Sequence, residues 1–430
     1  MEKTKKSTRF WLALVIFSLV GQVAWVVENM YLNVFIYKMF AASAGQISLM
    51  VAASSVAATV TTLLIGALSD KMGKRKLFIC GGYLCWGVSI LCFGLIREDW
   101  LDSLLPATVS AASVGIALVI ILDCVMTFFG SAANDACFNA WLTDSTDETN
   151  RGAAEGINAM MPLVAILAVF GGFMGLDQSL PESWTVIFFI IGGIVLVLGV
   201  LGFWLIEEPK VDTKDNQSYF GNLLYGFRPA VIRENHKLYL TLIAYGVFGI
   251  SINIFMPYLI LYYEKTLAMT NYVFVFAPAI ILAAVFTALY GRVYDKNGFT
   301  ASIIPSLVLL MAGYVLLYLF TNTALVFIGT VLMMCGYLSG MAVFGAMIRD
   351  NTPENKSGMF QGQRIICQVL IPGIIGPAIG AAVLKNAQQI VDSDGRLVFL
   401  PNANIFLAAL IAAVLILAAL IPVVKSLKKH

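Results

Sequence analysis

One sequence pattern occurs twice, as Gly66-Ala-Leu-Ser-Asp70-Lys71-Met-Gly73 and as Gly291-Arg-Val-Tyr-Asp295-Lys296-Asn-Gly298. The two copies are 225 residues apart (291 − 66). The same offset aligns Gly21 with Gly246 and Glu28 with Asn253. A repeat at a fixed offset indicates a duplicated architecture, so we expect two related halves.

A second repeated pattern supports the duplication. The residues around Asp144, Thr146 and Gly152 recur around Asp350, Thr352 and Gly358, at an offset of 206 (350 − 144). The drop in offset mostly reflects a longer loop near 97–112 in the first half. We therefore expect an N-terminal bundle over 1–206, a polar linker over 207–237 and a C-terminal bundle over 238–430.

The composition places these halves in a membrane. Of 430 residues, 60% are hydrophobic and 12% are charged, whereas soluble chains carry about 25% charged residues. A soluble enzyme and a nucleic-acid-binding protein are therefore excluded. A membrane helix needs about 20 mostly apolar residues, and twelve segments qualify: 10–38, 44–68, 76–96, 112–142, 152–176, 184–206, 238–263, 272–294, 300–320, 323–348, 354–384 and 403–424.

The basic residues predict the orientation of these helices. With the N-terminus inside, 22 of the 27 Lys and Arg residues fall on the cytoplasmic side, as the positive-inside rule requires. We expect an all-α membrane protein with twelve transmembrane helices in two pseudo-symmetric six-helix bundles, both termini being cytoplasmic. Parallel repeats of this kind, packed about a central cavity, are a transporter architecture.

The first repeat, extended through Lys74 and Arg75, resembles the signature between helices 2 and 3 of the major facilitator superfamily. A narrower stretch from Asp135 to Asp144, continuing to Arg151, is similar to the melibiose-permease-like symporters of glycosides, pentosides and hexuronides. The resemblance implies a monomeric twelve-helix transporter that works by alternating access.

The chain departs from the sodium-coupled members of that subfamily. They carry two Asp residues in helix 2, but 44–68 contains no acidic residue, and the Lys of their helix 11 is replaced by Arg364 and Gln368. Proton coupling, or no ion coupling at all, is therefore favoured over sodium coupling.

The repeated patterns are candidate gates. A carboxylate such as Asp70 can accept hydrogen bonds from the positive N-terminus of a neighbouring helix. In the superfamily the partner is the start of helix 11, and by symmetry Asp295 would hold the start of helix 5, near Thr146. The candidate gating residues are Gly66, Asp70, Lys71, Gly73, Arg75, Asp144, Arg151, Gly291, Asp295, Lys296, Gly298 and Asp350.

Acidic residues inside apolar spans are functional candidates, because a buried carboxylate costs several kcal/mol unless it is paired or protonated. Four lie well inside spans: Glu28, Asp123, Asp135 and Glu155. Asp135 matches the functional Asp of the resembled symporters, which implies a role as ligand or proton carrier. Structural roles in helix–helix contacts remain the alternative.

Other polar residues complete the candidate site. Steps of three and four place the polar residues of helix 1 on one stripe, and Trp25 offers a face on which a sugar ring can stack. Arg364 is expected to pair with Asp135 or Glu155 in one access state. The candidate substrate- or cation-binding residues are Gln22, Trp25, Glu28, Asn29, Asp123, Asp135, Asn139, Glu155, Asn158, Asn253, Tyr258, Arg364 and Gln368.

The sequence thus predicts a proton-coupled transporter of a small polar organic solute, most simply a sugar or glycoside, in a bacterial plasma membrane. The alternatives are a drug or lipid exporter of the same fold and a non-transporting membrane sensor. No nucleophile–base set, metal cluster or phosphate-binding loop is apparent in the sequence. We therefore do not expect the protein to be an enzyme or to bind a cofactor or a metal. The expected partners are the solute and the lipid bilayer, without nucleic acid.

Overall fold

The computed structural model describes residues 6–146, 150–208, 225–269, 271–353, 360–392 and 395–427. These residues are almost entirely helical, and a two-stranded hairpin departs from the all-α expectation. The chain divides into a first unit, Met1–Ala42 with Ala53–Asn216, and a second unit, Ser43–Ala52 with Gln217–His430. Helix α3 therefore contributes its first residues to the second unit and the remainder to the first.

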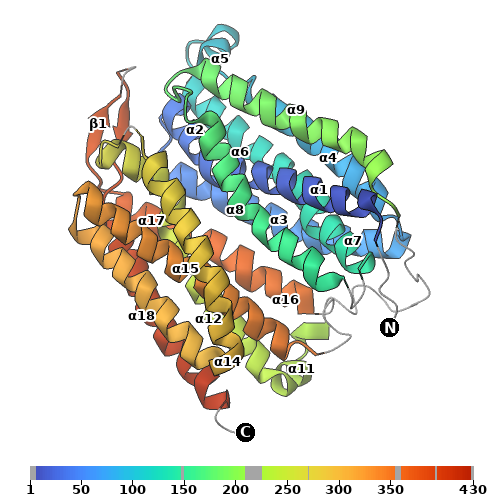
Figure 1. The fold of residues 1–430 in the computed structure, drawn as a ribbon. Coiled ribbons are helices and arrows are strands. Elements are labelled where there is room, and N and C mark those ends of the chain that lie inside the picture. Colours follow the sequence, from blue (N-terminus) through green and yellow to red (C-terminus); the bar gives the residue numbers. More distant parts are fainter. Residues whose placement is uncertain are drawn as a thin grey trace. The chain divides into compact units, whose positions relative to one another are not determined.

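The elements of the first unit are α1 Thr8–Val26, η1 Val27–Tyr31, α2 Leu32–Phe40, α3 Ala44–Met72, α4 Arg75–Phe93, α5 Glu98–Leu104, α6 Ala111–Gly130, η2 Ser131–Phe138, α7 Asn139–Asp144, α8 Arg151–Phe173 and α9 Pro181–Leu205. Helix α4 packs on α9, and α1 packs on α8 (Figure 1). A Cβ atom on Gly87 would lie 2.6 Å from the backbone nitrogen of Leu196, so glycine is what allows α4 and α9 to approach closely.

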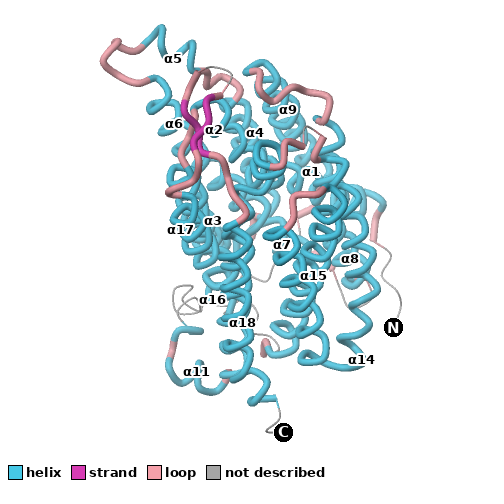
Figure 2. The backbone as a smooth tube through the Cα atoms, turned by 90° about the vertical axis from the view of Figure 1, so that its left-hand side faces the viewer, coloured by secondary structure: helices cyan, strands magenta, loops and turns pink. Residues whose placement is uncertain are grey.

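The elements of the second unit are η3 Tyr225–Phe227, α11 Pro229–Glu234, α12 His236–Phe255, η4 Met256–Tyr258, α13 Leu259–Leu261, η5 Tyr262–Thr266, α14 Val273–Leu319, α15 Thr323–Asn351, α16 Gln361–Ile365, η7 Ile366–Leu370, α17 Ile371–Leu384, β1 Gln389–Val391, β2 Leu397–Phe399 and α18 Asn404–Leu427. Helix α12 packs against α17 and α18, and α14 packs against α15. Strands β1 and β2 pair antiparallel, with Ile390 opposite Val398 (Figure 2).

The end of the predicted linker is folded. Residues 209–224 lie outside the described part of the chain, but η3 and α11 follow them. Val231 of α11 is buried in a cluster with Leu238, Leu242 and Phe360 of the second unit. The hydroxyl of Tyr239 donates to the carbonyl of Gly226. These residues of the predicted linker are therefore anchored to the second unit.

Within the described residues, eleven helices are long and apolar enough to cross a membrane. The predicted spans 272–294 and 300–320 both lie in α14, which is interrupted at Gly298. The Tyr290 hydroxyl donates to the Ser302 carbonyl at 2.7 Å, although twelve residues of straight helix would separate their backbones by about 18 Å. The chain therefore folds back at Gly298, which gives two arms and accounts for the twelfth span.

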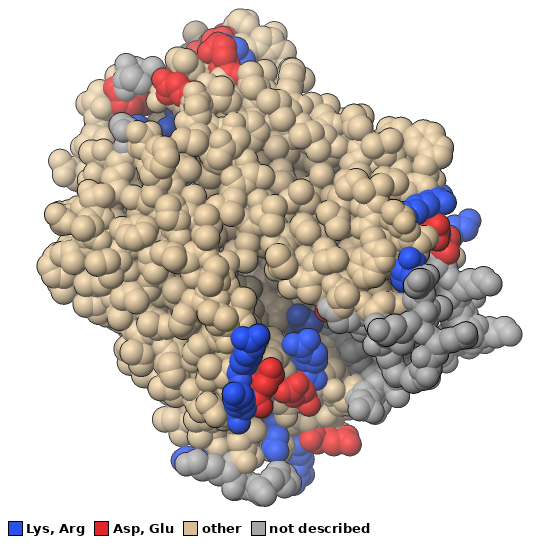
Figure 3. Space-filling view, in the orientation of Figure 1, with Lys and Arg blue, Asp and Glu red and all other residues tan. Residues whose placement is uncertain are grey.

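Charged side chains are sparse on the surface. Figure 3 shows them gathered in a few patches, with broad areas between that carry no Lys, Arg, Asp or Glu. Helix α9 illustrates the pattern, since Val197, Phe203 and Trp204 are exposed. A helix surface of this kind is suited to lipid.

Gly298 is expected to be intolerant of substitution. Its φ of 73° and ψ of −175° lie in a region open essentially to glycine alone. Gly298→Ala should therefore destabilise the protein by about 1–3 kcal/mol, seen as a lower melting temperature in detergent. Gly291→Ala is the matched control, because an added Cβ meets nothing within 4 Å at either position. An equal effect of both substitutions would contradict this explanation.

Candidate functional site

A buried polar cluster surrounds Glu28 in the first unit. Glu28 lies in the π-helical segment η1 and is 7% exposed. The hydroxyls of Ser54 on α3 and Thr127 on α6 each donate to its Oε1 at 2.8 Å, and they lie 2.9 Å from each other. Three helices thus contribute side chains to one carboxyl group.

Asp123 adjoins this cluster on α6, one turn before Thr127. It is 2% exposed, interacts electrostatically with Glu28 and contacts the Ser54 hydroxyl. Glu28 Oε2 and Asp123 Oδ1 are buried and have no hydrogen-bond partner among the described residues. An unsatisfied buried polar atom costs about 1–3 kcal/mol, which makes this cluster a candidate functional site.

Asp135 lies in a second π-helical segment, η2, and is less deeply buried than Glu28 and Asp123. Its carboxylate accepts hydrogen bonds from Ser131 at 3.0 Å and from Asn134 at 3.5 Å. The Trp25 side chain also lies within reach of this carboxylate. The Trp25 ring packs on Trp86, with centroids 5.1 Å apart. Asp135 therefore combines a carboxylate, an amide and an aromatic face.

The π-helical segments were not predicted from the sequence. Glu28, Asp135 and Gln368 all lie in such segments, namely η1, η2 and η7. Single π-helical turns within α-helices occur frequently at functional sites. Because a π-turn shifts the helical phase, side chains after it point in directions that an α-helical periodicity does not give.

The predicted polar stripe of helix 1 is divided. Glu28 is buried, whereas Asn29 is exposed and donates to the carbonyl of Trp25. Gln22 is half-buried. The residues of the stripe therefore differ in burial, and their shared orientation toward a cavity stays a prediction.

The other candidates of the first unit do not join the Glu28 cluster. Glu155 is exposed, and Asn158 accepts a hydrogen bond from Ser18 at 2.6 Å. Asn139 is exposed and donates to the backbone carbonyl of Asp135.

The candidates of the second unit are dispersed. Arg364 is exposed, and its Nε donates to Gln368 at 3.2 Å. Asn253 donates to the carbonyl of Gly249 at 2.9 Å. Tyr258 is fully buried, and its hydroxyl lies 3.0 Å from the Ala44 carbonyl and 3.3 Å from that of Pro377. Tyr258 therefore ties the start of α3 to α17 within the second unit.

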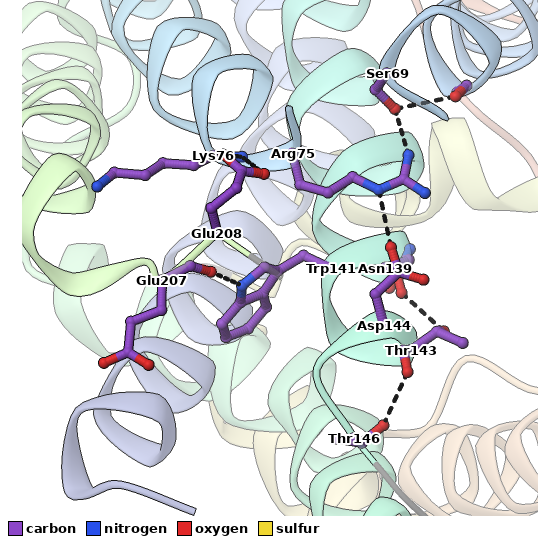
Figure 4. Close-up of polar contacts among 11 residues, drawn as sticks. Ser69, Arg75, Lys76, Asn139, Trp141, Thr143, Asp144, Thr146, Glu207 and Glu208 are labelled. Atoms are coloured by element: carbon purple, nitrogen blue, oxygen red, sulfur yellow. Dashed lines mark hydrogen bonds and ion pairs between the residues drawn. The ribbon is translucent and has the colours of Figure 1, made fainter. Parts of the chain in front are cut away.

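Arg75 organises a second polar cluster, at the end of the first unit that bears the repeated pattern (Figure 4). Its guanidinium donates to Asp144 at 3.0 Å and to the Ser69 hydroxyl at 2.6 Å. The Glu208 carboxylate accepts from the backbone nitrogen of Lys76 at 3.2 Å, which caps α4. This cluster joins the ends of α3, α4, α7 and α9.

The rest of the first gating pattern is less informative. Gly66 is adjacent to Ala136 of η2, Lys71 is exposed, and Gly73 has a φ of 63° that ends α3. The side chains of Asp70 and Arg151 lie outside the described part of the structure, as does the start of the predicted helix 11 at 354–359. The predicted contact of Asp70 with that helix stays a prediction.

The second repeat makes the equivalent contact with different residues. The offsets align Ser69 with Tyr294 and Asp144 with Asp350. Tyr294 donates directly to Asp350 at 2.5 Å, and no arginine occupies the position of Arg75, which is Thr300. Asp295 and Lys296 are exposed, as is the flanking Gly291. The long Tyr294 side chain thus reaches Asp350 directly, whereas the short Ser69 side chain is connected to Asp144 through Arg75.

The Arg75 cluster predicts an asymmetric response to substitution. Arg75 is 4% exposed, whereas the side chain of Asp144 is 28% exposed. Asp144→Asn removes a carboxylate that pairs with a buried cation and should lower the free energy of unfolding by about 3 kcal/mol. Arg75→Gln leaves a carboxylate that water can reach and should be milder. Thermal unfolding measures both variants, with the exposed Lys74→Gln as control, and a milder effect of Asp144→Asn would contradict the expectation.

No group of three His, Cys, Asp or Glu residues in the described part of the chain is arranged to hold a metal ion. The candidate site is therefore a set of carboxyl, hydroxyl, amide and aromatic groups. Such groups bind protons and polar organic molecules through hydrogen bonds and stacking.

Comparison with known proteins gives a consistent result. The family model described as Major Facilitator Superfamily matches residues 10–377, and no curated protein sequence matches the chain. Among solved structures, the nucleoside transporter NupG superposes with a TM-score of 0.71 at 14% identity, covering 96% of this chain and 99% of that one. A bacterial homologue of the human lysosomal transporter Spinster, inward-facing and unoccupied, gives 0.70 at 14% identity, covering 99% of both chains. The xylose transporter XylE from E. coli gives 0.68 at 12% identity, covering 96% and 98%.

Proposed function

Because the chain belongs to the major facilitator superfamily, and is therefore a transporter rather than an enzyme, we propose that it moves a small polar organic solute by alternating access. The observation that carries this proposal is the Glu28, Asp123 and Asp135 region of the first unit. Carboxyl groups inside membrane helices are expensive and mark solute or ion pathways.

The proposed solute is a sugar or a glycoside. The Asp135 carboxylate can accept directional hydrogen bonds, and Trp25 offers an aromatic surface next to it. This combination suits a ring that carries hydroxyl groups. The resemblance of 135–151 to the melibiose-permease-like symporters supports the same class, and the similar structures include a xylose transporter and a nucleoside transporter.

The proposed coupling ion is the proton. Helix α3 supplies Ser54 but no acidic side chain to the buried cluster, so the two helix-2 carboxylates of the sodium-coupled symporters have no counterpart here. Glu28 and Asp123 make no salt bridge within the described residues. A proton is the simplest way to neutralise them.

The proposed setting is the plasma membrane of a bacterium, with both termini in the cytoplasm and the protein acting as a monomer. The distribution of Lys and Arg supports this orientation, since 22 of the 27 fall on the cytoplasmic side. The Arg75 cluster then lies at the cytoplasmic surface, where it holds helix ends together close to the expected gate.

A thermal-stability screen tests the function. The purified protein is heated with sugars, glycosides, nucleosides and lipophilic cations, with and without sodium, at two pH values. A solute at a hundred times its Kd stabilises the folded state by about 2.7 kcal/mol. We expect a sugar or glycoside to raise the melting temperature without any need for sodium. Stabilisation by lipophilic cations alone would favour an exporter, and a sodium-dependent shift would overturn proton coupling.

A further inference from the structure

We propose that Glu28 and Asp123 together hold one exchangeable proton, and that this carboxyl pair is the coupling site, separate from the solute-facing Asp135. The inference rests on the proposed function and deepens it by assigning different tasks to the three carboxyl groups. The proton forms an O–H bond with a carboxylate oxygen when the site faces one side, and it passes to water when the site faces the other.

The two unpartnered oxygens provide the place for the proton. Glu28 Oε1 already accepts two hydroxyl hydrogen bonds, which leaves Oε2 as its unused atom. Asp123 likewise has its Oδ1 buried and unpartnered. Ser54 contacts both carboxyl groups. Two buried carboxylates that interact electrostatically repel each other when both are charged, and one shared proton removes that repulsion.

The oxygen atoms around Glu28 are spaced as in a hydrogen-bonded cluster. Glu28 Oε1, Ser54 Oγ and Thr127 Oγ1 are mutually separated by 2.8, 2.8 and 2.9 Å. These distances are typical of hydrogen bonds between oxygen atoms. The cluster is therefore arranged around hydrogen atoms.

Asp135 differs from the pair in its surroundings. It accepts from Ser131 and Asn134, and it is more exposed than either member of the pair. Its charge acts on Glu28, so a solute that binds at Asp135 changes the electrostatic environment of the proton site. Within the described residues, the titratable groups near these carboxyls include Cys124 beside Asp123, Tyr83 beside Asp135 and Tyr31 in the same segment as Glu28.

Infrared spectroscopy of the protein in lipid membranes tests the inference without any solute. A protonated carboxyl group has a C=O stretching band that disappears when the proton is lost. As pH rises, we expect the wild type to lose a band equivalent to one carboxyl group. The double variant Glu28→Gln, Asp123→Asn should lack this band. Asp102→Asn is the matched control, since Asp102 is an exposed carboxylate on α5, and it should leave the band unchanged.

A second variant tests whether the proton lies next to Glu28. Thr127→Val keeps the side-chain shape and removes one hydrogen bond to Glu28, so the band should shift in frequency while the folded protein persists. A band that persists in the double variant, or one unmoved by Thr127→Val, would overturn the assignment. Solute flux is measured separately. Proton-driven transport by a protein that lacks this band would contradict the proposed proton site, whereas a protein that shows the band but transports no solute would contradict the proposed function.

Discussion

Glu28→Gln is expected to abolish accumulation of the solute against its gradient while preserving exchange of solute across the membrane. A glutamine side chain can still accept hydrogen bonds from Ser54 and Thr127, but it cannot bind and release a proton. With one proton per solute, a pH gradient of about one unit supports about tenfold accumulation, because each 1.4 kcal/mol is a factor of ten. The ratio of internal to external solute should fall to about one in the variant.

Proteoliposomes separate the two activities. Uptake driven by an imposed pH gradient measures coupling, and counterflow between unlabelled internal and labelled external solute measures movement alone. Asp102→Asn is the control and should retain both. If Glu28→Gln still concentrates the solute, Glu28 does not carry the coupling proton. If it loses counterflow as well, Glu28 acts in solute binding or in folding.

Asp135→Asn is expected to weaken solute binding strongly. The wild-type carboxylate is held by Ser131 and Asn134 and lies beside Trp25, so it is oriented to accept hydrogen bonds from solute hydroxyls. A hydrogen bond to a charged group contributes about 1.5–3 kcal/mol, which corresponds to roughly 10- to 150-fold in Kd. Counterflow and uphill uptake should therefore fall together.

The contrast between the two variants is the test of separate roles. Equilibrium binding by calorimetry gives Kd for the wild type, Asp135→Asn and Glu28→Gln. Asp135→Asn should raise the Kd for the solute at every pH. Glu28→Gln should instead change how Kd varies with pH, with less effect on the lowest Kd reached. Unchanged Kd in Asp135→Asn would remove that residue from the solute site.

Much of the fold could be predicted from the sequence because membrane burial imposes long apolar segments. The repeat centred on Asp70 and Asp295 identified two halves, and Gly298 proved to be the point where α14 folds back. The carboxyl groups at 28, 123 and 135 stood out because charge is rare in such helices.

The arrangement of these groups could not be predicted. The π-helical segments η1 and η2 shift the directions of the side chains around Glu28 and Asp135. The sequence gives no indication of these segments, because membrane helices are apolar on every side and their hydrophobic periodicity is weak. The pairing of Glu28 with Ser54 and Thr127 depends on three helices that are far apart in sequence. In the second repeat, a direct Tyr294–Asp350 hydrogen bond replaces the contact made through Arg75. The alignment of Ser69 with Tyr294 pointed to this difference, but only the structure shows that the tyrosine side chain is long enough to reach Asp350.

The central claim is that this protein couples movement of a polar organic solute to movement of protons. The most direct measurement is uptake of the stabilising sugar or glycoside into sodium-free proteoliposomes with an acidic exterior. The account predicts accumulation above the external concentration that a protonophore collapses. Saturable binding without net flux, or accumulation that requires sodium, would contradict it.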